Sequence, residues 1–198
     1  MEPAITADVL IQAGHEGRTT GRLGAVGPLG KEIEWTPIVA DAATEKLRAH
    51  GVNVLRVNAD EIRDRYYKVV AAVYIHFDGN DEVCVTGASI GYPGEHSEFH
   101  NNCASSAEAA DAWRAMYSQH IPYRFMPDNF TKNLLDYYGF GPVEVTDCKL
   151  VLEMGEIDCP EQATWMQPRL QWMGHMVAHF LSQRIQKGNV PHPGPPNA

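Results

Sequence analysis

Short apolar runs alternate with longer amphipathic segments along this chain of 198 residues. Continuous apolar runs that end at glycine or polar residues are typical of buried β-strands, and apolar residues that recur every three to four positions are typical of helices. Strands are predicted over residues 8–12, 52–57, 72–77, 83–88 and 149–154. Helices are predicted over residues 37–50, 58–70, 105–120, 131–138 and 168–186. This alternation predicts one α/β domain with a mostly parallel or mixed central sheet flanked by helices.

Cap and turn residues place some of the boundaries between these segments. Thr36 followed by Pro37 is typical of an N-cap and a first helical position, which predicts that a helix starts there. Residues 14–30 form a glycine-rich loop, and a loop of that length is usually functional or mobile. The domain is expected to span residues 1–187, and the proline-rich residues 188–198 are expected to form a flexible tail or linker.

Composition and charge narrow the classes of function. The chain is 44% hydrophobic and 21% charged, which is ordinary for a globular domain. Its formal net charge is -9 and it has no cluster of Lys and Arg, so nucleic acid is not an expected partner. No apolar run approaches about 20 residues, so membrane insertion is not expected either. The oligomeric state is left open.

The four cysteines, at positions 84, 103, 148 and 159, contain no C-x-x-C pair, so a zinc-ribbon site is not indicated. Cys84 and Cys148 lie in apolar, strand-like runs. We expect both to be free buried thiols, because cysteine is among the residues most often buried. A structural disulfide is the alternative.

Three ionisable residues end predicted strands: His15, His76 and Glu153. The carboxyl ends of parallel strands meet at one edge of an α/β sheet, where ligands bind. His76 and Glu153 each end an apolar run, where an unpaired polar side chain is costly. Gly14 is expected to let the chain turn sharply off its strand, so that the His15 imidazole points at a ligand above the sheet edge.

Two histidines and a carboxylate form a known zinc-binding set that keeps a fourth position open for water. The acidic ligand is expected between the two histidines, and Glu32 and Glu34 both precede the predicted helix. Glu16 competes, but neighbouring residues rarely aim at one ion. No serine lies in a G-x-S-x-G nucleophile pattern, which disfavours a serine hydrolase.

Four segments together resemble the zinc-dependent N-acetylmuramoyl-L-alanine amidases with a phosphorylase/hydrolase-like fold: "IQAGHEG", "KEIEW…VADAATEKLRAHGVNV", "VYIHFDG" and "LVLEMGEID". The resemblance implies Zn²⁺ as cofactor and His15, Glu32 and His76 as its ligands, with Glu34 as the alternative to Glu32. It also implies that Glu153 is the catalytic glutamate. The implied substrate is peptidoglycan or a muropeptide, cleaved at the amide between N-acetylmuramic acid and L-alanine.

The chain departs from the family pattern, which usually has Asp-Pro before the Gly-His pair, glycine after it, and asparagine two residues after the second histidine. These positions hold Gln12-Ala13, Glu16 and Asp78, and the usual Thr-Arg is absent around Arg56-Val57. The departures motivate two alternatives: a zinc peptidase or amidase of the same fold on another amide, or a non-catalytic wall-binding module.

Substrate contacts are expected within residues 87–133, which carry several aromatic side chains. The expected place of action is the cell wall. The N-terminal residues lack the basic start and apolar core of a secretory signal. Phage-type release, release on lysis and a trimmed secreted enzyme are the routes compatible with that expectation.

Overall fold

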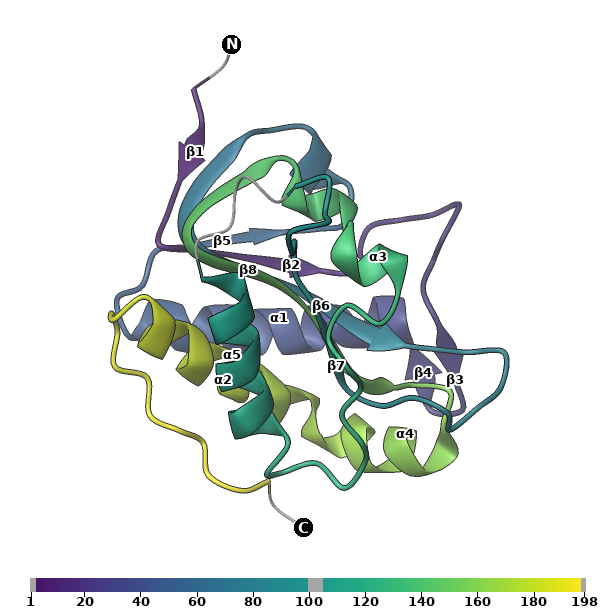
Figure 1. Cartoon of the computed structure of the whole chain (residues 1–198). Coiled ribbons are helices and arrows are strands. Elements are labelled where there is room, and N and C mark those ends of the chain that lie inside the picture. The colour runs from purple at the N-terminus through teal and green to yellow at the C-terminus, as the bar shows by residue number, and fades with distance from the viewer. Residues whose placement is uncertain (1–2, 100–104, 197–198) are drawn as a thin grey trace.

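The computed structural model describes residues 3–99 and 105–196 (Figure 1). A mixed sheet forms its centre. Its strands are β1 (Ile5–Thr6), β2 (Val9–Ala13), β5 (Val54–Val57), β6 (Tyr67–Asp78), β7 (Ser89–Gly91) and β8 (Val143–Glu156). The strand order is β5-β2-β6-β8-β7, with β1 paired to β6. All pairs are parallel except β7 with β8. A small antiparallel hairpin, β3 (Val26–Gly27) and β4 (Gly30–Lys31), lies in the glycine-rich loop.

Helices cover the sheet. They are α1 (Glu32–Ala49), α2 (Ser106–Tyr117), α3 (Lys132–Leu135), α4 (Pro160–Met166) and α5 (Leu170–Arg184). Among the described residues there are also three short 3-10 helices, η1 (Glu61–Arg63), η3 (Tyr138–Phe140) and η4 (Gln167–Arg169). The α/β architecture with a mixed sheet is therefore confirmed, as are the predicted strands in β2, β5 and β8 and the helices in α2 and α5. None of these helices, within the described residues, is long and apolar enough to cross a membrane.

The alternation of side chains along β2 divides the core into two layers. Val9 and Ile11 face a layer built with α1, α2, α4 and α5, which lie together on one side of the sheet in Figure 1. Leu10 faces a second layer that contains side chains of α3 and η3. Successive strand residues point to opposite faces, so each apolar run supplies both layers.

The predicted helix over 58–70 is wrong. The chain forms only the short η1 there, and β6 begins at Tyr67. Tyr67 and Val69 are buried while Lys68 between them is exposed, which is the period of a strand. Pairing with β1 and β8 completes the backbone hydrogen bonds of this part of β6, and that long-range pairing overrides the local helix signal.

Helix α1 starts at Glu32 rather than at Pro37. The backbone N–H of Lys31 donates to the Glu34 carboxylate at 3.2 Å, as in a capping box. Thr36 lies inside the helix, and its hydroxyl donates to the carbonyl of Gly14 at 2.6 Å. The residue expected to cap the helix therefore ties the helix to the loop after β2.

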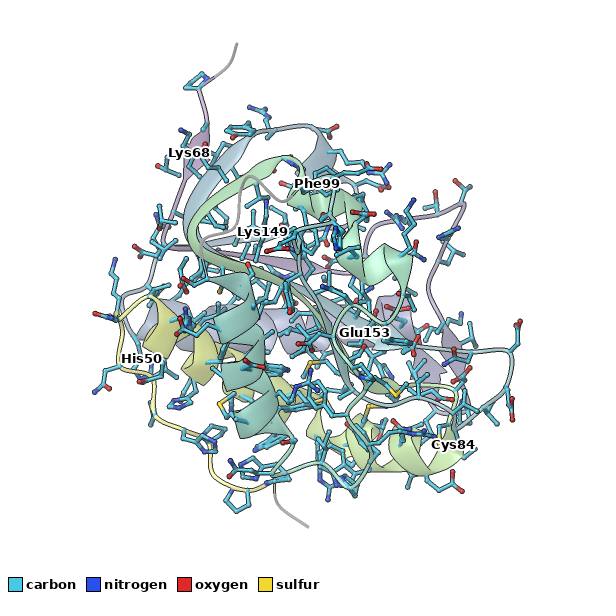
Figure 2. The ribbon with its side chains drawn as sticks, viewed as in Figure 1. His50, Lys68, Cys84, Phe99, Lys149 and Glu153 are labelled. Carbon is cyan, nitrogen blue, oxygen red and sulfur yellow. A yellow bond between two sulfur atoms is a disulfide. The ribbon has the colours of Figure 1, made fainter. Side chains whose placement is uncertain are left out.

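Cys84 is neither in a strand nor a free thiol. It forms a disulfide with Cys159, across a sequence separation of 75 residues, and it lies close to α4 in Figure 2. The predicted strand over 83–88 is wrong, because the chain forms a turn and irregular backbone there with an isolated bridge at Ala88, and the strand β7 starts at Ser89. Cys148 is a free buried thiol, as predicted. A disulfide that closes a loop of this length contributes about 4 kcal/mol in the chain-entropy description.

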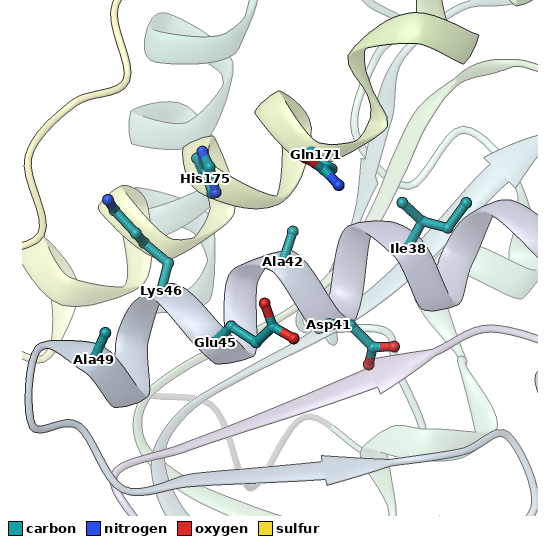
Figure 3. A pocket seen from close by; sticks show the side chains of 8 residues that line it. All are labelled: Ile38, Asp41, Ala42, Glu45, Lys46, Ala49, Gln171 and His175. Atoms are coloured by element: carbon teal, nitrogen blue, oxygen red, sulfur yellow. The ribbon is translucent and has the colours of Figure 1, made fainter.

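Helices α1 and α5 pack closely at Gly174, where a Cβ would overlap the backbone of Val39. Beside this contact the two helices leave a surface pocket of about 400 Å³, which Figure 3 shows between His175 on α5 and Glu45 on α1. Farther along, Val190 is buried, and the indole of Trp172 donates to the carbonyl of Gly194 at 2.9 Å. Part of the segment expected to be a tail thus lies against α5.

Candidate metal and catalytic site

Three adjacent parallel strands bring the predicted residues to one place. Ala13 pairs with Ile75 in the β2–β6 register, so the residues that follow, Gly14 and His76, are neighbours. His76 pairs in turn with Glu153 of β8. The side chains of His15, His76 and Glu153 all line one cavity of about 630 Å³.

The turn after β2 works differently from the expectation. The residue in the left-handed conformation is His15 itself, with a φ of 61°, whereas the φ of Gly14 is not positive. Glycine is needed at position 14 because a Cβ there would overlap the imidazole of His76. Gly14 therefore permits close approach of β2 to a side chain of β6, and His15 makes the turn.

The carboxylate of Glu32, the first residue of α1, is buried between the two histidines. Its Oε1 lies 2.8 Å from Nδ1 of His76, and its Oε2 lies 3.4 Å from Nε2 of His15. Backbone N–H groups of Ala25 and Phe77 donate to it at 2.8 and 3.1 Å. Burial raises the pKa of this carboxyl, but the hydrogen bond and charge of His76 lower it by more than burial raises it. The net pKa is therefore below its usual value, and Glu32 is ionised.

Glu34 and Glu16 lie elsewhere. Glu34 accepts the N–H of Lys31 and is exposed. Glu16 forms a bidentate ion pair with Arg56, with distances of 2.7 and 3.0 Å. Two departures from the family pattern, at positions 16 and 56, thus form one contact that holds the loop after β2 to β5.

A chain of hydrogen bonds leads from the His76 ring through Tyr137 to Gln12. Its Nε2 lies 2.9 Å from the hydroxyl of Tyr137, which donates to Oε1 of Gln12 at 2.6 Å. The Gln12 amide nitrogen faces the carbonyl of Ala59 at 3.4 Å, which fixes the direction of the amide. The hydroxyl proton of Tyr137 is therefore committed to Gln12, and its oxygen accepts from His76. Nδ1 of His76 is the ring nitrogen that faces Oε1 of Glu32.

Glu153 has an unsatisfied acid group. Its Oε2 is buried and has no hydrogen-bond partner among the described residues. Burial, followed by the charges of Glu32 and Asp78, raises the pKa of Glu153 well above its usual range. Figure 2 shows Glu153 on the central part of the sheet, close to β7. A carboxyl group in this state can take a proton and later release it.

The three possible ligand groups suit a zinc ion. Donor atoms of His15, Glu32 and His76 all lie within 4.8 Å of one another. Burial lowers the pKa of His15 although Glu32 opposes this, so its imidazole is neutral and keeps a lone pair. A carboxylate with two imidazoles is a donor set of catalytic zinc, which leaves one position for water. The unpartnered Oε2 of Glu153 lines the same cavity.

No protein-family model matches the chain, and no curated protein sequence matches it. Solved structures do. The N-acetylmuramoyl-L-alanine amidase AmiC2 of Nostoc punctiforme has a TM-score of 0.63 and 16% identity, over 93% of this chain and 100% of that chain. The catalytic domain of the amidase CwlV from Bacillus (Paenibacillus) polymyxa var. colistinus has a TM-score of 0.65 and 15% identity, over 91% and 99%. The catalytic domain of the CD27L endolysin targeting Clostridia Difficile has a TM-score of 0.60 and 12% identity, over 89% and 97%.

The chain shares the fold of these amidase structures. At these identities the likeness concerns the architecture, and it confirms the predicted α/β domain with a mixed central sheet flanked by helices. Within this fold, Tyr137 and Gln12 are contacts that sequence reasoning missed. A buried glutamine at the end of an apolar strand was the one available signal, because such a group requires a partner. From the region expected to bind substrate, only Thr131 and Asn133 line the cavity among the described residues.

Proposed function

We propose that this protein is a zinc-dependent hydrolase that cleaves the amide between N-acetylmuramic acid and L-alanine in peptidoglycan. The observation that carries the proposal is the convergence of His15, Glu32 and His76 beside Glu153 in one cavity. The fold shared with N-acetylmuramoyl-L-alanine amidases supports the choice of substrate. Zn²⁺ bound there would supply an activated water at neutral pH and polarise the scissile carbonyl.

The residues of the chain have separate tasks in this proposal. His15 and His76 hold the ion as neutral imidazoles, and Glu32 holds it as a carboxylate anchored by two backbone N–H groups. Glu153 accepts a proton from the attacking water and delivers it to the departing amine of L-alanine. A raised pKa suits the second half of this task, because the protonated acid must be stable enough to form.

The disulfide between Cys84 and Cys159 supports a place of action outside a reducing compartment. Disulfides persist in secreted and cell-surface proteins and are rare where glutathione keeps thiols reduced. The loop that carries Cys84 also continues from Gly79 and Asn80, which line the cavity. A cell-wall substrate agrees with this chemistry.

The test is digestion of purified peptidoglycan before and after chelation, followed by addition of zinc. The expected result is a zinc-restored release of peptides with a new L-alanine amino terminus, and glycan with free lactyl groups, both identified by mass spectrometry. Glu153→Gln should bind zinc without turnover, whereas His15→Ala should lose both. Activity that survives chelation would refute the zinc mechanism, and cleavage at another amide would refute the substrate assignment.

A further inference from the structure

Three arginines line the cavity that contains His15, His76 and Glu153. Arg18 and Arg22 come from the loop after β2, and Arg63 comes from η1. The whole chain carries 16 Lys and Arg residues against 25 Asp and Glu residues. The three arginines share the cavity with three acidic residues, Asp78, Asp136 and Glu153.

Arg18 is fixed in place by the protein. Its Nε lies 3.1 Å from Asp60, and its Nη2 donates to the hydroxyl of Tyr138 at 3.2 Å. The guanidinium of Arg63 stacks over the ring of the same tyrosine, 4.4 Å from its centroid. Tyr138 thus aligns two guanidinium groups at the cavity, which reduces the conformational freedom that binding would remove.

The positive charges of Arg22 and Arg63 are not neutralised by an acidic side chain of the described residues. Within residues 3–99 and 105–196, neither side chain forms an ion pair with a carboxylate, although Asp78 and Asp136 line the same cavity. Asp78 instead accepts the hydroxyl of Thr86 at 2.7 Å, and Asp136 accepts the N–H of Glu98 at 3.0 Å. These two aspartates of the cavity are thus occupied by other partners.

We propose that Arg22 and Arg63, supported by Arg18, bind a carboxylate of the substrate peptide, close to the L-alanine released at the scissile amide. This deepens the proposed amidase function and rests on it for the orientation of the peptide. Guanidinium groups form paired, charge-assisted hydrogen bonds with carboxylates, which a neutral carboxamide cannot replace. The α-carboxylate of a D-glutamyl unit after L-alanine is the group of this chemistry, and its amidated form removes the charge.

The test measures the binding of two synthetic peptides by calorimetry. One is L-alanyl-D-glutamate with its γ-carboxyl blocked as the methylamide, and the other is the same peptide with an α-carboxamide. Neither contains the lactyl amide, so neither can be consumed. The expected result is a preference of about tenfold or more for the carboxylate peptide, the size given by one charge-assisted hydrogen bond. Equal affinity for the two peptides would overturn the proposal.

Substitutions then assign the preference to residues. Arg22→Gln and Arg63→Gln should each reduce the ratio of the two affinities, and the double variant should bring it close to one. Arg65→Gln is the matched control, because Arg65 is an exposed arginine of the same segment that does not line the cavity. A preference that survives in the double variant would refute the assignment.

A measurement on the unsubstituted chain covers the case in which a variant folds poorly. The guanidinium NMR signals of Arg22 and Arg63 should shift with the carboxylate peptide and not with the carboxamide. Shifts confined to other arginines would overturn the proposal. The result is also separate from the amidase assay, because carboxylate selectivity without peptidoglycan cleavage would refute the proposed reaction and leave this binding site standing.

Discussion

Nε2 of His76 and the hydroxyl of Tyr137 are 2.9 Å apart, and this contact holds the ring on the side opposite to Nδ1, which faces Glu32 at 2.8 Å. Burial raises the pKa of Tyr137, so its hydroxyl stays neutral and keeps its hydrogen bond to Gln12. Tyr137 is a positioning residue here, since it acts through His76. Second-layer partners of metal-binding histidines usually contribute 10- to 100-fold to metal affinity, by order of magnitude.

Tyr137→Phe should therefore weaken zinc affinity by about 10- to 100-fold with little change in fold. Competition with a chromophoric chelator measures the affinity, and nitrogen NMR of the His76 ring reports its tautomer. Tyr74→Phe is the matched control, because Tyr74 is a buried tyrosine in ring contact with Tyr137 whose hydroxyl donates to the carbonyl of Gly139. Equal losses in both variants would mean that the aromatic cluster, rather than the contact with His76, controls the metal site.

Gly14→Ala should disturb the site through sterics alone. The added methyl group would overlap the His76 imidazole, which must then move away from Glu32. Overpacking of this kind costs about 1–3 kcal/mol. We expect a lower melting temperature and, above all, loss of the rise in melting temperature that zinc should give to the parent chain under the proposed function. Calorimetric scans with and without zinc measure both.

Gly94→Ala is the control for this change, because a Cβ at position 94 would meet its nearest neighbour at an ordinary 3.7 Å. It should retain the response to zinc. A Gly14→Ala variant that binds zinc like the parent would show that His76 can shift without loss, and that close approach at this position has no role in the site.

The placement of His15 and His76 near the carboxyl ends of β2 and β6 was predictable, because each residue follows an apolar run that does form a strand. The start of α1 and the first half of β6 were not. The hydroxyl of Thr36 donates to the carbonyl of Gly14, and Tyr67 pairs with a strand on each side, β1 and β8. Both partners are distant in the sequence, so no local preference for a cap or a helix reveals them.

The departures from the family pattern became interpretable only with the fold. Glu16 and Arg56 looked like two separate irregularities, and they are one ion pair. Gln12 was another departure from the family pattern, and it is the acceptor for Tyr137. Paired substitutions of this kind cannot be found from one sequence, because each residue alone predicts only that a partner exists. The ligand and catalytic roles of His15, Glu32, His76 and Glu153 stay predictions.

Glu153 connects the chemistry of the site to the stability of the fold. Burial, with the charges of Glu32 and Asp78, raises its pKa in the folded chain above the value in the unfolded chain. Between these two pKa values the folded state binds more protons than the unfolded state. The free energy of unfolding therefore falls as pH rises through this range, and it is unaffected by Glu153 below the unfolded pKa.

Glu153→Gln removes this penalty, so the metal-free variant should be more stable than the metal-free parent at pH 8 and equal to it near pH 4. We expect a difference of a few degrees in melting temperature at the higher pH. Glu82→Gln, which removes an exposed carboxylate, is the control. If the variant is more stable but has lost turnover, Glu153 lowers the stability of the fold and is needed for catalysis. A variant less stable than the parent at both pH values would instead mean that the carboxyl group stabilises the fold, against the assignment made from its unpartnered oxygen.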